Sequence, residues 1–369
     1  MPRQPRVTHW QYFTLISGVL IANGIMSMPR AVAADAGRSA WLVILLVGCI
    51  VAVLTWLAHL VASHFPTRDA AEWPKTLLGP ILGRIWMMAY LLRAIIFLLL
   101  TAQLYAGYLS VRLFPRTPTH VFALLVLALS LLAVLAKVRG FARFSEVAFY
   151  MSIPLILFII IPFTKGNTLH LLPLVGDTPP SDLLKSALAA SYSYAGFDFL
   201  WFVYPHLRRK ASAGTVAFGA VLLTAIVYAF VTATTIMYFG LEKLGLIFLP
   251  TLAALRGIEM VLFERIDSLM MFAWLSTVVV TAAAQLYTAT RLVQGLANGL
   301  SFPKVAAGLS GLFFIVAYSV TDLPLYQTIA ISDIFGIFDL SFFVTSIFVF
   351  LILALVRNRK GDKCDEPAD

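Results

Sequence analysis

The chain contains 369 residues, of which 60% are hydrophobic and only 12% are charged, and its formal net charge is +9. Soluble domains carry about a quarter of charged residues, so this composition excludes a soluble globular protein and indicates a polytopic membrane protein. Positive charge is typical of cytoplasmic membrane loops, and no basic stripe interleaves with aromatic residues, so we expect no nucleic-acid partner. The six histidines are scattered without metal-ligand spacing, so we predict no metal site.

Ten apolar segments follow one another along the chain, each close to the roughly 20 residues with which a helix crosses the hydrocarbon core. We expect ten transmembrane helices at 9–28, 40–63, 82–110, 119–136, 144–163, 183–205, 214–239, 266–294, 303–320 and 334–356. They form a single transmembrane domain over residues 1–369, with a short polar tail at 357–369. The start of the chain also resembles a cleaved signal peptide, but Asn23 and Gly24 interrupt its apolar core, which favours a retained first helix.

The first segment is interrupted by small, helix-disfavouring residues, Ala22, Asn23 and Gly24, in front of Ile25. A break inside hydrocarbon leaves backbone N–H and C=O groups without partners, which is costly unless they line a cavity or bind a ligand. We expect a short half-helix after the break that ends near Pro29, and its free N–H groups would suit a carboxylate. The alternative is a glycine that only allows close helix packing.

The sixth segment carries a second interruption, which consists of Tyr194, Ala195 and Gly196. Phe197 and Asp198 follow it directly, and a carboxylate at membrane depth must face a cavity or a partner. We therefore expect both interruptions to contribute to one substrate-binding site.

The two interruptions occupy matching places in two halves of five segments each, about 9–163 and 183–356. Paired interruptions of this kind indicate the substrate site of a transporter-type fold. Because five is an odd number, the second half must enter the membrane from the opposite side, which predicts a LeuT-like 5+5 inverted repeat with broken helices 1 and 6. Lysines and arginines concentrate on one side of the segments, which predicts that both termini lie in the cytoplasm.

Arg93, in the third segment, is the natural partner of Asp198 because both are charged residues within apolar segments. The pair could be purely structural, or one of its members could contact a ligand directly or take part in gating. Both interpretations stay open at the level of sequence.

Three hydroxyl residues of the eighth segment, Ser276, Thr277 and Thr281, lie on successive helical turns. In a LeuT-like fold this helix passes the first interruption, so the hydroxyls could coordinate a ligand or a co-bound H+ or Na+. The alternative, which the residue types favour, is that they bond to carbonyls of their own helix or of a neighbouring helix.

Several short motifs in this order resemble the B subunits of spore nutrient germinant receptors (GerAB/GerKB-type), within the amino acid–polyamine–organocation superfamily. The motifs are NGIMSMP at 23–29, PRTP at 115–118, GFD at 196–198 with YP at 204–205, and ERIDSL at 264–269 followed by Trp274. The likeness spans essentially the whole chain. Asp198 departs from the pattern, since glutamate is more usual after the Gly-Phe pair.

The resemblance implies a receptor subunit in the spore inner membrane that works with an A subunit and a lipoprotein C subunit and recognises a small nutrient, usually an amino acid. Two alternatives are an amino-acid or cation permease coupled to H+ or Na+, and a structural scaffold with an empty pocket. We do not expect an enzyme, because the segments contain no nucleophile–base set, and no cofactor is predicted.

Overall fold

The computed structural model describes residues 7–173, 178–257, 266–297, 299–319 and 323–359. Apart from one parallel β-bridge between Val7 and Leu207, the regular elements in these ranges are helices. Glu264 and Arg265 of the ERIDSL motif, the first six residues and the tail beyond residue 359 lie outside the described residues.

Seven helical stretches within the described ranges are long and apolar enough to cross a membrane: Gly24–Ser63, Pro80–Arg112, Lys137–Lys165, Ala213–Leu246, Ser268–Leu296, Phe302–Ser319 and Leu325–Val356. The apolar helix Thr119–Leu135 is shorter. The chain is therefore an all-helical, multi-pass membrane protein, whereas the count of ten spans stays a prediction.

The first half of the chain contains α1 (His9–Leu20), α2 (Gly24–Ala36), α3 (Ala40–Ser63), α4 (Trp73–Leu78), α5 (Pro80–Arg112), α6 (Thr119–Leu135), α7 (Lys137–Phe158) and α8 (Ile160–Lys165). The second half contains α9 (Pro180–Ala189), α10 (Leu200–Val203), α11 (Ala213–Leu246), α12 (Pro250–Arg256), α13 (Ile266–Leu296), α14 (Phe302–Ser319) and α15 (Leu325–Arg359). Short 3₁₀ helices are η1 (Gly37–Ser39), η2 (Thr168–Leu171), η3 (Ser191–Tyr194), η4 (Phe197–Phe199) and η5 (Tyr204–His206).

Local sequence explains where several helices begin. Thr8 and Gln11 form a reciprocal capping box at the start of α1, with both hydrogen bonds at 3.2 Å. Helices α5, α9 and α12 start at Pro80, Pro180 and Pro250. Proline suits this position because the N–H it lacks would have no partner in the first helical turn.

Helix α2 corrects one sequence-based expectation, since it does not end near Pro29 but continues to Ala36. Proline cannot donate to the carbonyl four residues before it, which in α2 belongs to Ile25. The hydroxyl of Thr251, on α12, donates to that carbonyl at 2.7 Å instead. The helix therefore passes through Pro29 without leaving an unpaired carbonyl at membrane depth.

Helices α7 and α15 start seven and nine residues earlier than the apolar windows predicted, at Lys137 and Leu325 instead of 144 and 334. The windows excluded polar residues in both places. In α7 the added residues include lysines and arginines, which are good helix formers and can extend their charged ends to the membrane surface. The residues added to α15, 325–333, contain no lysine or arginine. The polar 64–81 stretch likewise contains α4.

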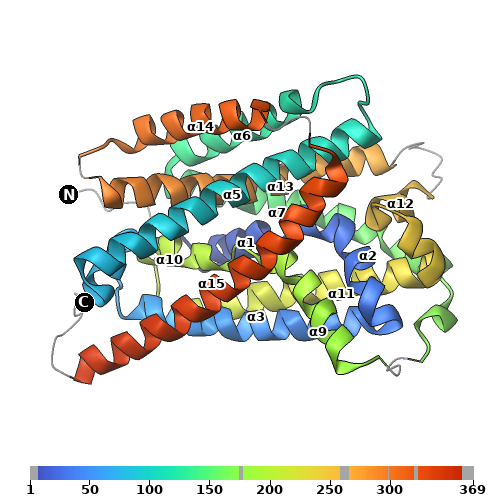
Figure 1. Ribbon diagram of the computed structural model, residues 1–369, viewed down its shortest axis with the longest axis horizontal. Coiled ribbons are helices and arrows are strands. Elements are labelled where there is room, and N and C mark those ends of the chain that lie inside the picture. The colour runs from blue at the N-terminus through green and yellow to red at the C-terminus, as the bar shows by residue number, and fades with distance from the viewer. Residues whose placement is uncertain (1–6, 174–177, 258–265, 298, 320–322, 360–369) are drawn as a thin grey trace.

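The helices pack around a central α1, which contacts α7, α11 and α13. Helices α3 and α11 lie side by side along one edge of the bundle, α14 and α6 lie along the opposite edge, and α15 runs obliquely across the others (Figure 1). Short elements η3, η4 and α10 contact α15, α1 and α3, so the segment 191–206 is held inside the bundle.

Candidate functional site

The α-helix is interrupted between Leu20, the last residue of α1, and Gly24, the first of α2. Side chains of other helices donate to the carbonyls around this interruption. Thr281 donates to Val19 O at 2.8 Å, Tyr228 to Leu20 O at 2.7 Å and the Trp274 indole N–H to Ala22 O at 3.2 Å. Helices α11 and α13 thus stabilise the unwound backbone by donating hydrogen bonds to its carbonyls.

The second interruption separates α9, which ends at Ala189, from α10, which begins at Leu200. The chain between them forms η3 and η4, joined at Gly196, whose φ of 108° favours glycine because a Cβ would be strained there. The Tyr194 hydroxyl donates to Ile44 O on α3 at 2.8 Å and ties this segment to the bundle.

The two interruptions are in direct contact, and glycine makes the contact possible. A Cβ on Gly24 would lie 2.8 Å from the Cα of Ser193, and a Cβ on Gly196 would lie 2.7 Å from Val19 Cγ1. Asn23 is 1% exposed; its amide nitrogen donates to Thr101 O at 2.7 Å, while its Oδ1 has no hydrogen-bond partner among the described residues. The residues predicted from sequence therefore come together, in a closely packed arrangement.

Arg93 lies beside the second interruption and is fully buried, with two carboxylates around its guanidinium group. Nη2 and Nη1 bind the two Asp198 oxygens at 3.2 and 3.3 Å, Nε binds Asp339, and Nη1 also donates to Gln285 Oε1 at 2.7 Å. The hydroxyl of Tyr90 donates to Asp198 as well. We call Tyr90, Arg93, Asp198, Gln285 and Asp339 the Arg93 network.

The Arg93 network connects α5, η4, α13 and α15 through charge-assisted hydrogen bonds. Aromatic rings cover the guanidinium group: its carbon lies 4.8 Å from the Phe343 ring centroid and 5.0 Å from that of Phe97. Both Asp198 oxygens accept hydrogen bonds and the residue is 1% exposed, so a ligand can reach the carboxylate only after this arrangement opens.

Packed aromatic rings continue away from the network along α10. Trp201 stands edge-on to Trp73, with centroids 5.4 Å apart, and its indole donates to Ala58 O at 2.9 Å. Beyond the rings, Arg291 Nε binds Asp69 Oδ2 at 2.7 Å. This side of the two interruptions, which we call the α10 side, is closed by rings and ion pairs.

The opposite side, which we call the α2 side, is hollow. A cavity of about 290 Å³ lies between α2, α15 and Phe248, and Arg30 and Asp333 both line it. The Phe248 ring lies 5.9 Å from the Arg30 guanidinium carbon, and neither charged group forms an ion pair with another described residue. This Arg30 cavity offers one positive and one negative group to a small molecule.

Helix α5 contacts the Arg93 network and the two interruptions at successive turns. From its start toward its end, Arg93 binds Asp198, Phe97 lies 3.6 Å from the position of a Gly196 Cβ, and Thr101 O accepts from Asn23. Arg30 lies on α2, which leads away from the interruptions after Gly24, so the interruptions lie between the Arg93 network and the Arg30 cavity.

The hydroxyls predicted on the eighth segment divide into two groups. Ser276 and Thr277 donate to carbonyls of their own helix, Ala273 O at 2.7 Å and Trp274 O at 2.8 Å. Thr281 alone reaches across to α1. The local geometry favours the structural interpretation for the first two and gives Thr281 a direct part in holding the interruption.

Asp339, Arg30 and Asp333 belong to this region but were not selected from the sequence. Asp339 lies in the predicted tenth segment, where a carboxylate among apolar residues is the same signal that marked Asp198. Arg30 and Asp333 sit near the ends of their apolar windows, where charged residues are common. Within the described ranges no group of three or more His, Cys, Asp or Glu side chains could hold a metal ion.

Comparison with solved structures defines the fold of the chain. The chain is similar to Mhp1, a nucleobase-cation-symport-1 family transporter solved in a closed conformation with bromovinylhydantoin bound, with a TM-score of 0.62 and 12% identity over 88% of this chain and 75% of that one. At this identity the likeness shows the fold alone, which is that of a membrane transporter.

Sequence comparison then shows the family. The family model for spore germination proteins matches residues 6–322, so the chain belongs to that family. It is 22% identical to spore germination protein GerQB of Bacillus cereus, over 74% of this chain and 76% of that one. It is also 22% identical to spore germination protein A2 of Bacillus subtilis (strain 168), over 96% and 97%. The chain is thus a germination receptor or permease-like membrane protein and not an enzyme.

Proposed function

We propose that the chain is the nutrient-sensing membrane subunit of a spore germinant receptor, and that a small zwitterion, most simply an amino acid, binds where the two interruptions meet. The observation that carries the proposal is that the contact between the two interruptions lies beside the Arg30 cavity. A carboxylate suits Arg30 or the N–H groups at the start of α2, and an ammonium group suits Asp333.

The proposed architecture is the ten-span, 5+5 inverted repeat, with α1–α2 and α9–α10 as its two broken helices. In this arrangement both termini lie in the cytoplasm, so the Arg30 cavity lies toward the outer side of the membrane and the buried Arg93 network lies toward the cytoplasmic side. The subunit would sit in the spore inner membrane beside A and C subunits and respond to a nutrient that arrives from outside.

Ligand binding in this mechanism separates Gly24 from Ser193 and inserts the ligand between the residues of the two interruptions. The Arg93 network then transmits the change, because η4 carries Asp198 and α15 carries Asp339. A ligand shifts such an equilibrium only through different affinities for its two states, and a change from 1:99 to 99:1 requires about 5.5 kcal/mol. Asp198 thus acts in gating, through Arg93.

Replacement of Gly24 by leucine tests the proposal, because the larger side chain would occupy the place where the ligand inserts. We expect nutrient-triggered germination to be lost while the receptor complex still assembles. A normal response from an intact complex would contradict a ligand site between the interruptions. A thermal-shift screen of the twenty amino acids on the purified chain would then identify the ligand class.

The second candidate function is transport of an amino acid or cation together with H+ or Na+, and the likeness to a transporter fold favours it. Uptake of labelled amino acids into proteoliposomes distinguishes the two. Gradient-driven accumulation would favour a permease, whereas ligand binding without accumulation would favour a sensor that keeps the α10 side closed.

A further inference from the structure

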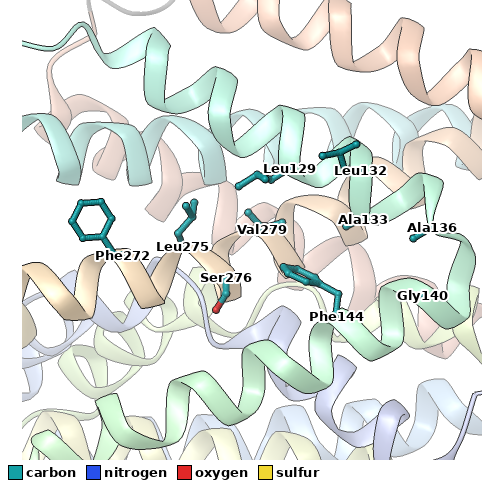
Figure 2. A pocket seen from close by; sticks show the side chains of 10 residues that line it. All are labelled: Leu129, Leu132, Ala133, Ala136, Gly140, Phe144, Phe272, Leu275, Ser276 and Val279. Carbon is teal, nitrogen blue, oxygen red and sulfur yellow. The ribbon is translucent and has the colours of Figure 1, made fainter.

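A second hollow lies on the outside of the helix bundle, away from the interruptions. Helices α6, α7 and α13 enclose a groove of about 410 Å³, and Figure 2 labels the ten residues that line it. All of them are apolar or glycine except Ser276, whose hydroxyl already donates to Ala273 O. The groove therefore presents no unsatisfied side-chain polar group and suits a hydrocarbon chain.

The groove ends at the tight turn between α6 and α7, where Ala136 and Gly140 line it. Three basic residues, Lys137, Arg139 and Arg143, belong to the first two turns of α7 and are all exposed. Lys137 and Arg143 each lie three residues from Gly140, so they share its face of the helix.

The basic side chains at this end have no negative partner among the described residues. The first turn of α7 contains no acidic residue, and none of the ion pairs between described residues includes Lys137, Arg139 or Arg143. An apolar groove that opens onto an unpaired cluster of positive charge is complementary to a molecule with an acyl chain and an anionic headgroup.

We propose that this groove binds one acyl chain of an anionic glycerophospholipid, whose phosphate group is held by Lys137, Arg139 and Arg143. The apolar walls alone would accept any lipid tail, and the positive charges provide the preference for an anionic headgroup. A membrane-spanning helix of a partner protein is the competing occupant, but the basic cluster would give an apolar helix no advantage.

Helix α13 connects the lipid to the interruptions. Its groove side carries Ser276 and Val279, while Trp274 and Thr281 donate to the carbonyls of the first interruption. A lipid that packs against α13 therefore restrains the helix that holds the unwound backbone. We expect the bound lipid to raise the thermal stability of the protein.

The test compares phosphatidylglycerol and phosphatidylcholine with identical acyl chains, added to the full-length protein in detergent. Retained lipid is counted by native mass spectrometry and stability is followed by thermal unfolding. We expect phosphatidylglycerol to be retained and to raise Tm more than phosphatidylcholine does. Equal retention of both lipids would overturn the headgroup preference, and retention of neither would overturn the lipid site in favour of another occupant.

The double variant Lys137→Gln/Arg143→Gln should bind phosphatidylglycerol about 25-fold more weakly, which is about fivefold for each charge removed near the membrane surface. Its matched control is Arg208→Gln/Arg209→Gln, which removes two charges that lie outside the groove. An equal loss in the control would show general surface attraction and would contradict the site. Ala136→Phe, which fills the end of the groove, should reduce retention of phosphatidylglycerol without a change of charge.

Discussion

The two sides of the paired interruptions use charge in opposite ways. On the α10 side, Arg93 is buried with Asp198 and Asp339, and aromatic rings cover it. On the α2 side, Arg30 and Asp333 are half-buried around a cavity and form no ion pair with a described residue. One side therefore has its charges satisfied within the protein, and the other has charges free to meet a ligand.

The difference in charge pairing indicates which side of the interruptions can change its conformation at a low free-energy cost. Removing one member of a buried ion pair leaves an uncompensated charge in a medium that solvates it poorly. A half-buried charge beside a cavity keeps water as a partner and can exchange that water for a ligand. We therefore expect the α10 side to resist change and the α2 side to admit the proposed ligand.

The largest effect is expected for Arg93→Ala. It leaves Asp198 and Asp339 buried without their cation, which should destabilise the protein by about 3–5 kcal/mol. Unfolding of the purified protein in a lipid nanodisc measures this. Arg93→Met combined with Asp198→Asn and Asp339→Asn should recover much of the loss, and a triple variant as unstable as Arg93→Ala would contradict the charge argument.

A smaller effect is expected for Gly24→Ala, because its methyl group would press on the backbone of Ser193. Overpacking of this kind costs about 1–3 kcal/mol. The matched control is Gly308→Ala on α14, where a Cβ meets no atom within 4 Å and should be neutral or slightly stabilising. If both variants have the same unfolding free energy, the two interruptions are not in the close contact described.

Neutral substitutions in the Arg30 cavity should affect ligand response more than stability. We expect Arg30→Gln and Asp333→Asn each to raise the nutrient concentration needed for germination about 10-fold, the equivalent of about 1.4 kcal/mol in binding. Thermal unfolding should change little, since neither residue has an ion-pair partner to lose among the described residues. If both variants germinate at the same nutrient concentration as the unmodified protein, the Arg30 cavity does not take part in ligand binding.

The smallest effects separate the hydroxyls of α13. Thr281→Val leaves the Val19 carbonyl without its donor and should cost about 0.6–2 kcal/mol. Ser276→Ala removes only a bond within the same helix and should change stability by no more than about 0.5 kcal/mol. Chemical unfolding of the two variants side by side makes the comparison. A larger loss of stability for Ser276→Ala than for Thr281→Val would contradict the assignment of Thr281 as the hydroxyl that holds the first interruption.

Sequence reasoning predicted an interrupted backbone at residues 22–24 and 194–196, because small residues and glycines stand out in an apolar segment. It also suggested the Arg93–Asp198 pair, because isolated charges within apolar segments are rare. It did not reach Asp339 or Gln285, whose hydrogen bonds to Arg93 depend on how α15 and α13 approach α5. Nor did it predict that Thr251 would donate to the Ile25 carbonyl and so allow α2 to continue beyond Pro29.

The amino-acid sequence alone determined that this chain is a helical membrane protein in which small and polar residues interrupt two apolar segments, because hydrophobicity and glycine content are local properties. Tertiary structure decided which partner each polar group meets. Val19, Leu20 and Ala22 receive donors from α13 and α11, helices more than 200 residues away. Such contacts depend on helix rotation and crossing angle, which packing sets and local sequence does not encode.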